Sequence, residues 1–438
     1  MGSRVPLRSR KGCWTCRDRH KKCDEEKPEC FRCQKAGRTC GGYGQRLTWL
    51  KPRRVTRRAK TRTPEIALDL DASGCSSSET TSPSDPWCAG SPRSGPDVEA
   101  LLFEKFRRSG QYTLAGRTAR EDESMNQILS LCSSWPALRY VVLAYQAHLD
   151  LDYRNLSAVY LNQALEIYQT YLRDPERLVH DATLITGILL CSVGIAGNMQ
   201  WTMHLDGLEA ILIQRGSMDP YNRPPPIANL VEVVGLFDLP TVTIGRIHSK
   251  RKLWARFVTP SQTSGIEPTS GLPRSLLNIV SLLGSKDVEH SLLSWPGERG
   301  EDYAHHFLWE AFRYSAILNN RALMTPRNNF LDTPVILMKI LASVEALWQM
   351  KRDPFKQPLK TTVLFPLFTA GLYVDEDSRD KEFVTECFQE LMADGNSRYS
   401  LAWDILLETW GRRTEHLYES LHIADKFAME MRVEVHLY

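Results

Sequence analysis

The sequence lacks an apolar segment long enough to cross a membrane. Its opening stretch, MGSRVPLRSRKG, has no apolar core of the kind that a secretory signal requires. The best candidate span, residues 182–197, is short and interrupted by threonine, serine and glycine, so it predicts a buried helix. We therefore expect an intracellular protein with no membrane partner. Disulfides rarely persist in that compartment, and clustered thiols more often bind metal there.

The sequence also lacks the short motifs of common enzyme classes. It contains no H-E-x-x-H, no G-x-S-x-G, no P-loop and no G-x-G-x-x-G after a strand. His204 shares a helical face with Trp201, Leu205 and Leu208, which is typical of a core histidine and not of a catalyst. We predict that the protein is not an enzyme.

Alternating runs of β-branched residues are scarce, which argues against a β-rich fold. From about Val98 onward apolar residues recur at spacings of three and four, most regularly in residues 153–171. Similar stretches are residues 124–131, 135–149, 181–193, 333–350 and 400–410. Residues 218–226 and 259–273 are rich in proline and polar residues and predict long loops. Residues 99–438 are therefore predicted to form a large all-α domain.

Acidic residues are scarce at the N-terminal end of the chain. Residues 1–62 contain 20 of the 55 lysines and arginines but only five of the 52 acidic residues, so the rest of the chain is acidic. Such asymmetry suggests a head that binds a polyanion on an acidic body. Residues 51–62 are a basic run, and residues 63–98 form a Ser/Pro-rich stretch that predicts a disordered linker. That linker contains no apolar heptad for a dimerising coiled coil.

Cysteine, in contrast, is concentrated at one place. Six of the eleven cysteines fall within residues 13–40. They are Cys13, Cys16, Cys23, Cys30, Cys33 and Cys40. Each half of this set has the pattern C-x2-C-x6-C, and two cysteines separated by two residues can direct both sulfurs to one tetrahedral zinc ion. Residues 1–50 are thus predicted to be a small module stabilised by metal.

Counting ligands predicts how the metal is bound. Two zinc ions with four thiolates each require eight ligands, so six cysteines can serve both ions only if two sulfurs bridge them. The symmetric choice of bridging residues is Cys13 and Cys30, the first cysteine of each half. One ion would then be bound by Cys13, Cys16, Cys23 and Cys30, and the other by Cys13, Cys30, Cys33 and Cys40. A single zinc ion with two spare thiols and a set of three disulfides are the alternatives.

Residues 11–49, KGCWTCRDRHKKCDEEKPECFRCQKAGRTCGGYGQRLTW, resemble the fungal binuclear zinc cluster family of transcription factors. The resemblance implies two short helices, one after each C-x2-C, related by a pseudo-twofold axis through two zinc ions. It also implies sequence-specific binding to double-stranded DNA in the nucleus, commonly at a CGG triplet. A module with so little apolar core depends on zinc for its folding free energy, on the order of 10 kcal/mol or more.

The resemblance also assigns the DNA contacts. The family's groove-contacting pair falls on Arg19 and His20, and His20 stands where better-known members often carry lysine. Lys21 is a further candidate for contacting bases, because a lysine can donate to guanine O6 or N7. Three other cations are expected to contact phosphates: Arg17, Lys22 and Lys35. In the alternative interpretation all of these cations bind only phosphate. Asp24, next to Cys23, is predicted to accept backbone N–H bonds in a turn.

A second resemblance lies in the body. Residues 199–217, MQWTMHLDGLEAILIQRGS, and residues 363–371, VLFPLFTAG, are similar to two segments of the fungal-specific transcription factor regulatory domain. Together the two resemblances imply a transcription regulator of RNA polymerase II genes that could control a secondary-metabolite or stress-response gene set. A non-enzymatic zinc scaffold and a ligand-sensing co-regulator with weak DNA selectivity are the alternatives. Since the linker offers no coiled coil, we expect any homodimer to form through the helical body.

Overall fold

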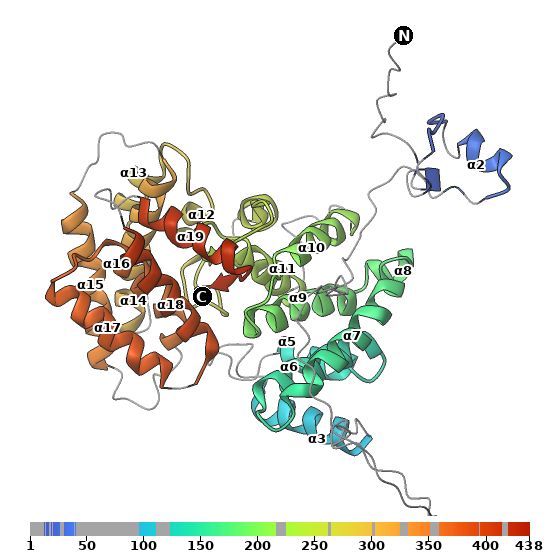
Figure 1. The fold of residues 1–438 in the computed structure, drawn as a ribbon, viewed down its shortest axis with the longest axis horizontal. Helices are drawn as coiled ribbons and strands as arrows, with labels where there is room; N and C mark the ends of the chain where they lie inside the picture. The colour runs from blue at the N-terminus through green and yellow to red at the C-terminus, as the bar shows by residue number, and fades with distance from the viewer. Residues whose placement is uncertain are drawn as a thin grey trace, which may run out of the picture. The chain divides into compact units, whose positions relative to one another are not determined.

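The computed structural model describes residues 13, 15–16, 19, 21–26, 30–38, 40, 96–110, 123–215, 225–261, 264–299, 303–324, 332–350, 359–393, 395–413 and 419–438. The chain divides into two compact units, Met1–Thr63 and Pro64–Tyr438 (Figure 1). Of the predicted basic segment and linker at 51–98, residues 51–95 lie outside the described residues, whereas residues 96–98 belong to a helix that begins at Pro96. The domain boundaries at residues 50 and 98 stay a prediction.

The N-terminal unit is small, and its described helix is α2, Phe31–Lys35. Cys30 caps this helix, because its sulfur accepts the backbone N–H of Cys33 at 3.2 Å. Thr15 and Cys16 are also helical. The helix was expected to follow the second C-x2-C motif, but α2 contains the second cysteine of that motif. The reason is the cap: a sulfur on the first cysteine satisfies an N–H of the first turn, so the helix starts directly behind it.

The first half of the body is a set of helices around α9. Its elements are α3 (Pro96–Lys105), the π-helix η1 (Phe106–Gly110), α5 (Glu123–Leu131), α6 (Pro136–Leu149), α7 (Arg154–Tyr171), α8 (Pro175–Leu178), α9 (Asp181–Ala196) and α10 (Met203–Gln214). Helix α9 packs against α5, α6, α7, α8 and α10 (Figure 1). It is apolar on nearly every side, and it is the helix predicted as buried over 182–197.

The second half of the body is formed by the remaining elements. They are α11 (Pro225–Phe237), β1 (Thr243–Ile244), the π-helix η3 (Trp254–Val258), the 3-10 helix η4 (Thr259–Ser261), α12 (Arg274–Val280), α13 (Val288–Leu293), α14 (Tyr303–Leu323), α15 (Thr333–Met350), α16 (Leu359–Tyr373), α17 (Arg379–Met392), α18 (Ser397–Arg412), α19 (Ser420–Met431) and β2 (Val435–His436). Helix α16 is the centre of this half, with α14, α15, α17, α18 and α19 around it (Figure 1).

The prediction of a helical body is confirmed, with one addition. Strands β1 and β2 form a two-stranded antiparallel ladder in which Thr243 is opposite His436. A two-residue strand is too short to show a period of two, so the sequence did not predict this ladder. No single described helix is long and apolar enough to span a membrane, although the bent pair Met125–Leu131 and Pro136–Leu149 passes by length and composition alone.

Both segments that resemble the regulatory domain lie in the core. Trp201 is fully buried just before α10, and it packs edge-on against Phe237 and His436. In α16 the bulky apolar side chains between Val363 and Leu372 are buried, and Pro366 lies inside the helix. These segments are therefore packing elements of the body.

Candidate metal centre and nucleic-acid interface

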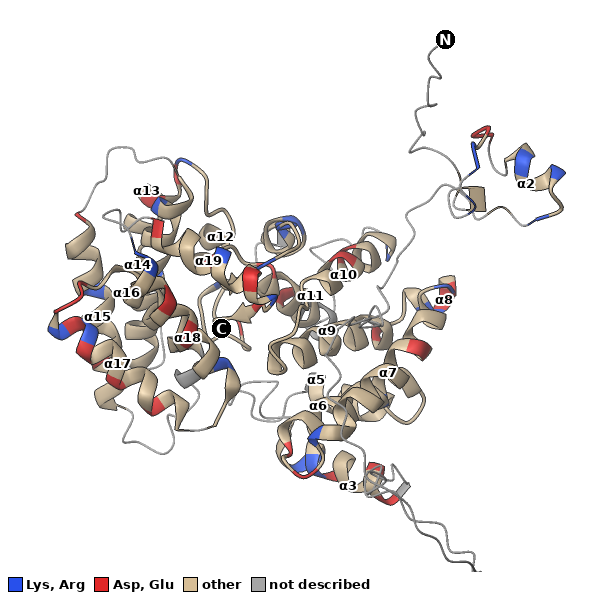
Figure 2. Ribbon diagram, viewed as in Figure 1, with Lys and Arg blue, Asp and Glu red and all other residues tan. Residues whose placement is uncertain are grey.

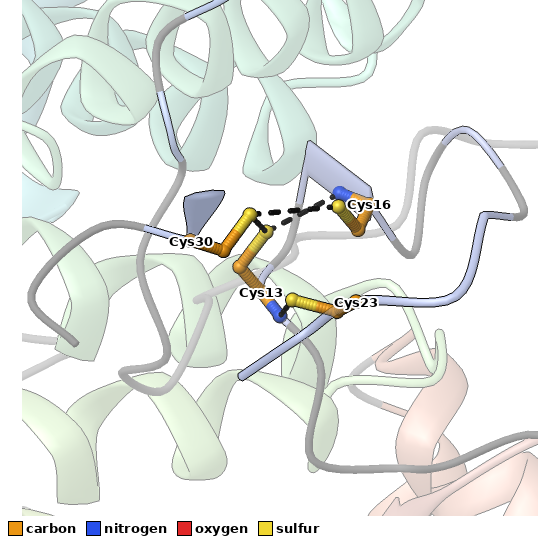
Figure 3. Close-up of side chains that lie close together, drawn as sticks. All are labelled: Cys13, Cys16, Cys23 and Cys30. Carbon is orange, nitrogen blue, oxygen red and sulfur yellow. Dashed lines mark hydrogen bonds between the residues drawn. The ribbon is translucent and has the colours of Figure 1, made fainter. Parts of the chain in front are cut away.

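The six clustered cysteines meet in space. Their sulfur atoms form two groups, and within each group all sulfurs lie within 4.8 Å of one another. The first group is Cys13, Cys16, Cys23 and Cys30, which Figure 3 draws, and the second is Cys13, Cys30, Cys33 and Cys40. Cys13 and Cys30 belong to both groups, and their sulfurs are 3.5 Å apart. These groups have the same membership as the ligand sets obtained by counting.

The two halves of the module repeat each other at an offset of 17 residues. The N–H of Cys13 donates to the sulfur of Cys23 at 3.3 Å, and the N–H of Cys30 donates to the sulfur of Cys40 at 3.4 Å. Likewise the N–H of Cys16 donates to Cys13 and that of Cys33 donates to Cys30. N–H donors stabilise a sulfur that carries negative charge, so both halves are built to hold thiolates.

The donor set fits zinc. Four thiolates about 2.3 Å from a zinc ion lie about 3.8 Å from one another. The sulfur of Cys16 is 3.7 Å from that of Cys30, and the sulfur of Cys13 is 3.7 Å from that of Cys33. All the cysteines that the structure describes are free thiols, which disfavours the alternative with three disulfides.

Burial makes three thiols of this cluster less acidic. Burial raises the pKa of Cys30 to about 12, and burial also raises the pKa of Cys13 and of Cys16. A metal ion is the group that would bring these thiols to the thiolate form at neutral pH, because binding releases the protons. Folding of the module and metal binding are therefore coupled.

A second set of contacts holds the chain between the two halves. Asp24 accepts the backbone N–H of Arg32 at 2.7 Å and that of Glu26 at 3.4 Å. The prediction that Asp24 accepts backbone N–H bonds is thus confirmed. The guanidinium of Arg32 donates to the carbonyl oxygen of Lys22 at 2.8 Å.

The described cations predicted to contact DNA are all exposed. Arg19, Lys21 and Lys22 lie in and directly after the first helical turn, where the N–H of Lys21 donates to the carbonyl of Cys16 at 2.9 Å. Lys35 lies on α2, which carries basic residues, whereas the turn before it is acidic (Figure 2). Arg17 and His20 lie outside the described residues.

Arg32 is the residue that sequence reasoning missed. Its position between two metal-binding cysteines gives the only local signal, and a lone exposed arginine resembles any solvated surface charge. Its partner, the Lys22 carbonyl, is a backbone group that no side-chain pattern marks.

Comparison with known protein families identifies the family of this chain. Residues 11–50 match the fungal Zn(2)-Cys(6) binuclear cluster domain. Residues 118–289 and 285–422 match the fungal specific transcription factor domain, which covers more than half of the chain. The chain belongs to the fungal-specific transcription factor family. The transcription factor family is not enzymatic and implies action in the nucleus, and the Zn(2)-Cys(6) domain implies DNA binding and two zinc ions.

Curated relatives of this transcription factor are similar over the cluster alone. The pestheic acid cluster transcriptional regulator 3 of Pestalotiopsis fici is 60% identical over 45 residues, which is 10% of this chain and 8% of the relative. The aspercryptin biosynthesis cluster-specific transcription regulator atnN of Emericella nidulans is 63% identical over 41 residues, 9% of this chain and 7% of the relative. The arginine metabolism regulation protein II of Saccharomyces cerevisiae is 56% identical over 41 residues, 9% of this chain and 5% of the relative.

The aligned part of the chain thus spans less than a tenth of the length of each of these three relatives. No solved structure matches the chain.

Proposed function

We propose that this transcription factor binds a CGG-type triplet in the major groove through the first half of its zinc cluster. In this proposal Cys13 and Cys30 bridge two zinc ions, Cys16 and Cys23 complete the first site, and Cys33 and Cys40 complete the second. The observation that carries the proposal is the division of six sulfurs into two groups of four that share two members.

The distribution of charge supports the assignment of the first half of the cluster to the bases. Arg19, Lys21 and Lys22 are exposed on the segment between Cys16 and Cys23, whereas the corresponding stretch of the second half, QKAGRT, has fewer cations. We assign base contacts to Arg19, His20 and Lys21, and phosphate contacts to Arg17, Lys22 and Lys35. A helix in the major groove needs such flanking phosphate contacts to set its register.

The test is an unbiased selection of binding sites with the full chain loaded with zinc. We expect CGG or a close variant to be enriched, with affinity for the selected duplex well above that for random DNA at physiological salt. Recovery of random sequences would instead favour a zinc scaffold or a ligand-sensing co-regulator.

The relatives suggest which genes are controlled. Two of the three named relatives are regulators of biosynthetic clusters by their names. We infer that this protein controls a secondary-metabolite gene set, with stress-response genes as the second candidate. Transcript profiling after deletion of the gene tests this assignment. Loss of transcripts from one co-localised group of biosynthetic genes would support it, and a change confined to general metabolism would contradict it.

We also propose that the helical body forms a homodimer. A single cluster contacts about three base pairs, too few for selectivity among roughly a million competing sites. Paired clusters would contact two triplets, and the chain between cluster and body would raise the effective concentration of the second cluster. Light scattering on residues 99–438 and on residues 1–98 tests this arrangement. A monomeric body at micromolar concentration would contradict it.

A further inference from the structure

Two hydrogen bonds join the halves of the zinc module at one point. The carboxylate of Asp24 accepts the N–H of Arg32, and the guanidinium of Arg32 donates to the carbonyl of Lys22. We call this pair of contacts the Asp24–Arg32 clamp. It connects the end of the basic segment to the first turn of α2.

The clamp is not part of the repeat that holds the metal. The N–H···S bonds recur in both halves at an offset of 17 residues. At the same offset Asp24 corresponds to Gly41, which has no carboxylate, and Arg32 corresponds to Thr15, which has no guanidinium. Among the described residues the clamp therefore lies beside the half that carries the basic segment, and the symmetric N–H···S pattern does not include it.

The clamp helps to hold the backbone of the basic segment from Arg19 to Lys22. At its start the N–H of Arg19 donates to the carbonyl of Thr15 at 3.3 Å, and at its end Arg32 holds the carbonyl of Lys22 at 2.8 Å. The side chains of Lys21 and Lys22 themselves remain exposed. The backbone is thus held at both ends while the cations stay available.

We propose that Arg32 and Asp24 are positioning residues that determine the base selectivity of the segment from Arg19 to Lys22. This inference rests on the proposed function, in which that segment contacts bases. Hydrogen bonds to base edges tolerate only small errors in position, whereas contacts to phosphates are less demanding. Loosening the clamp should therefore reduce selectivity more than overall affinity.

The competing role for Arg32 is a direct phosphate contact. Substitution of Asp24 distinguishes this role from the positioning role. Replacing Asp24 removes no cation, and the loss of a negative charge should by itself strengthen binding to any DNA. Asp24→Ala and Asp24→Asn both remove that charge, but only alanine removes the side-chain acceptor for the N–H of Arg32. The two variants are thus matched in charge and differ in the clamp.

The experiment uses the full chain loaded with zinc, the duplex selected by the wild type, and a random duplex of equal length. Asp24→Ala should lower the ratio of specific to random affinity about fivefold to tenfold, as expected for one lost hydrogen bond, and should still bind two zinc ions. Asp24→Asn should retain most of the wild-type ratio. Arg32→Ala should lower the ratio similarly and leave the dependence of binding on salt unchanged.

Three results would overturn the inference. They are a wild-type ratio in Asp24→Ala, loss of zinc from Asp24→Ala, and a decrease of the salt slope by roughly 0.9 in Arg32→Ala, which would identify a phosphate contact. A wild-type protein without selectivity is a distinct result, because it would refute the proposed function itself.

Discussion

The carboxylate of Glu434 accepts the backbone N–H groups of Trp201 and Thr202 at 2.7 Å each, although Glu434 and Thr202 are 232 residues apart. The same carboxylate accepts the hydroxyl of Thr202 and the N–H of Ile247. Glu434 is fully buried, and it satisfies donors at the start of α10 that have no partner within the helix. The residue directly before β2 is thereby tied to the first of the two segments that resemble the regulatory domain.

Glu434→Ala should destabilise the body by about 3–5 kcal/mol, because it leaves several buried donors without an acceptor. Denaturant unfolding followed by tryptophan fluorescence measures the change. The control is Glu430→Ala, which removes a half-exposed carboxylate from α19 and its ion pair with Arg412. This control should change the stability by less than about 1 kcal/mol. Equal effects of the two substitutions would show that the buried contacts of Glu434 contribute little.

Gly371 and Gly411 form a matched pair of helical glycines. A Cβ atom on Gly371 in α16 would lie 2.6 Å from the Cδ2 atom of Leu406 in α18, whereas one on Gly411 would meet nothing within 4 Å. Gly371→Ala should therefore cost about 1–3 kcal/mol through overpacking. Gly411→Ala should stabilise the body by up to about 1 kcal/mol through helix propensity. Thermal unfolding of both variants measures these opposite shifts, and a neutral Gly371→Ala would mean that α16 and α18 can separate at low cost.

Substitution of the cysteines should distinguish bridging from terminal ligands. Cys13→Ala removes a member of both sulfur groups and should abolish binding of both zinc ions and of DNA. Cys23→Ala removes a member of one group and should leave more zinc bound than Cys13→Ala does. Cys132→Ala, a change in the core of the body, should retain two zinc ions. Elemental analysis of the purified proteins gives the numbers, and one zinc ion in the wild type would rule out the bridged cluster.

The salt dependence of DNA binding should separate the two kinds of cation. Lys35→Ala should weaken binding to specific and random duplexes alike and lower the salt slope by roughly 0.9, the value for one phosphate contact. Arg19→Ala should cost about 1–3 kcal/mol on the selected site and relax selectivity at one base. Titrations at several salt concentrations measure both quantities. Equal losses on both duplexes for Arg19→Ala would leave only phosphate binding at that position.

The stability of the body should fall as the pH falls below about 6.5. Burial lowers the pKa of His436 to about 3, so the unfolded chain takes up a proton near pH 6.5 that the folded chain does not. The contribution of His436 is present above that pH and decreases at lower pH, by about 2 kcal/mol at pH 5. His436→Asn should flatten the dependence of the unfolding free energy on pH between 5 and 8. An unchanged slope would show that other groups cause the acid sensitivity.

The sequence by itself determined the metal module and the class of the body. The six cysteines lie within residues 13–40, so their spacing nearly specifies the two sulfur groups. Helices such as α7 and α15 have apolar periods that are local properties of the chain, and they formed close to where they were predicted. Both kinds of signal involve residues close in sequence, where spacing limits the possible geometry.

Only the tertiary structure decided the contacts between distant or unpatterned groups. Examples are Glu434 at the start of α10, the pairing of β1 with β2, and Leu406 against Gly371. The clamp between Arg32 and the carbonyl of Lys22 is a shorter-range case of the same kind. Each of these contacts depends on where folding places a backbone group or a Cα atom. Nearly every residue has the same backbone groups, so the sequence does not mark which of them will make a contact. Spacing alone therefore predicted which cysteines gather into the two sulfur groups, whereas the folded chain was needed to find which contacts hold the residues around them.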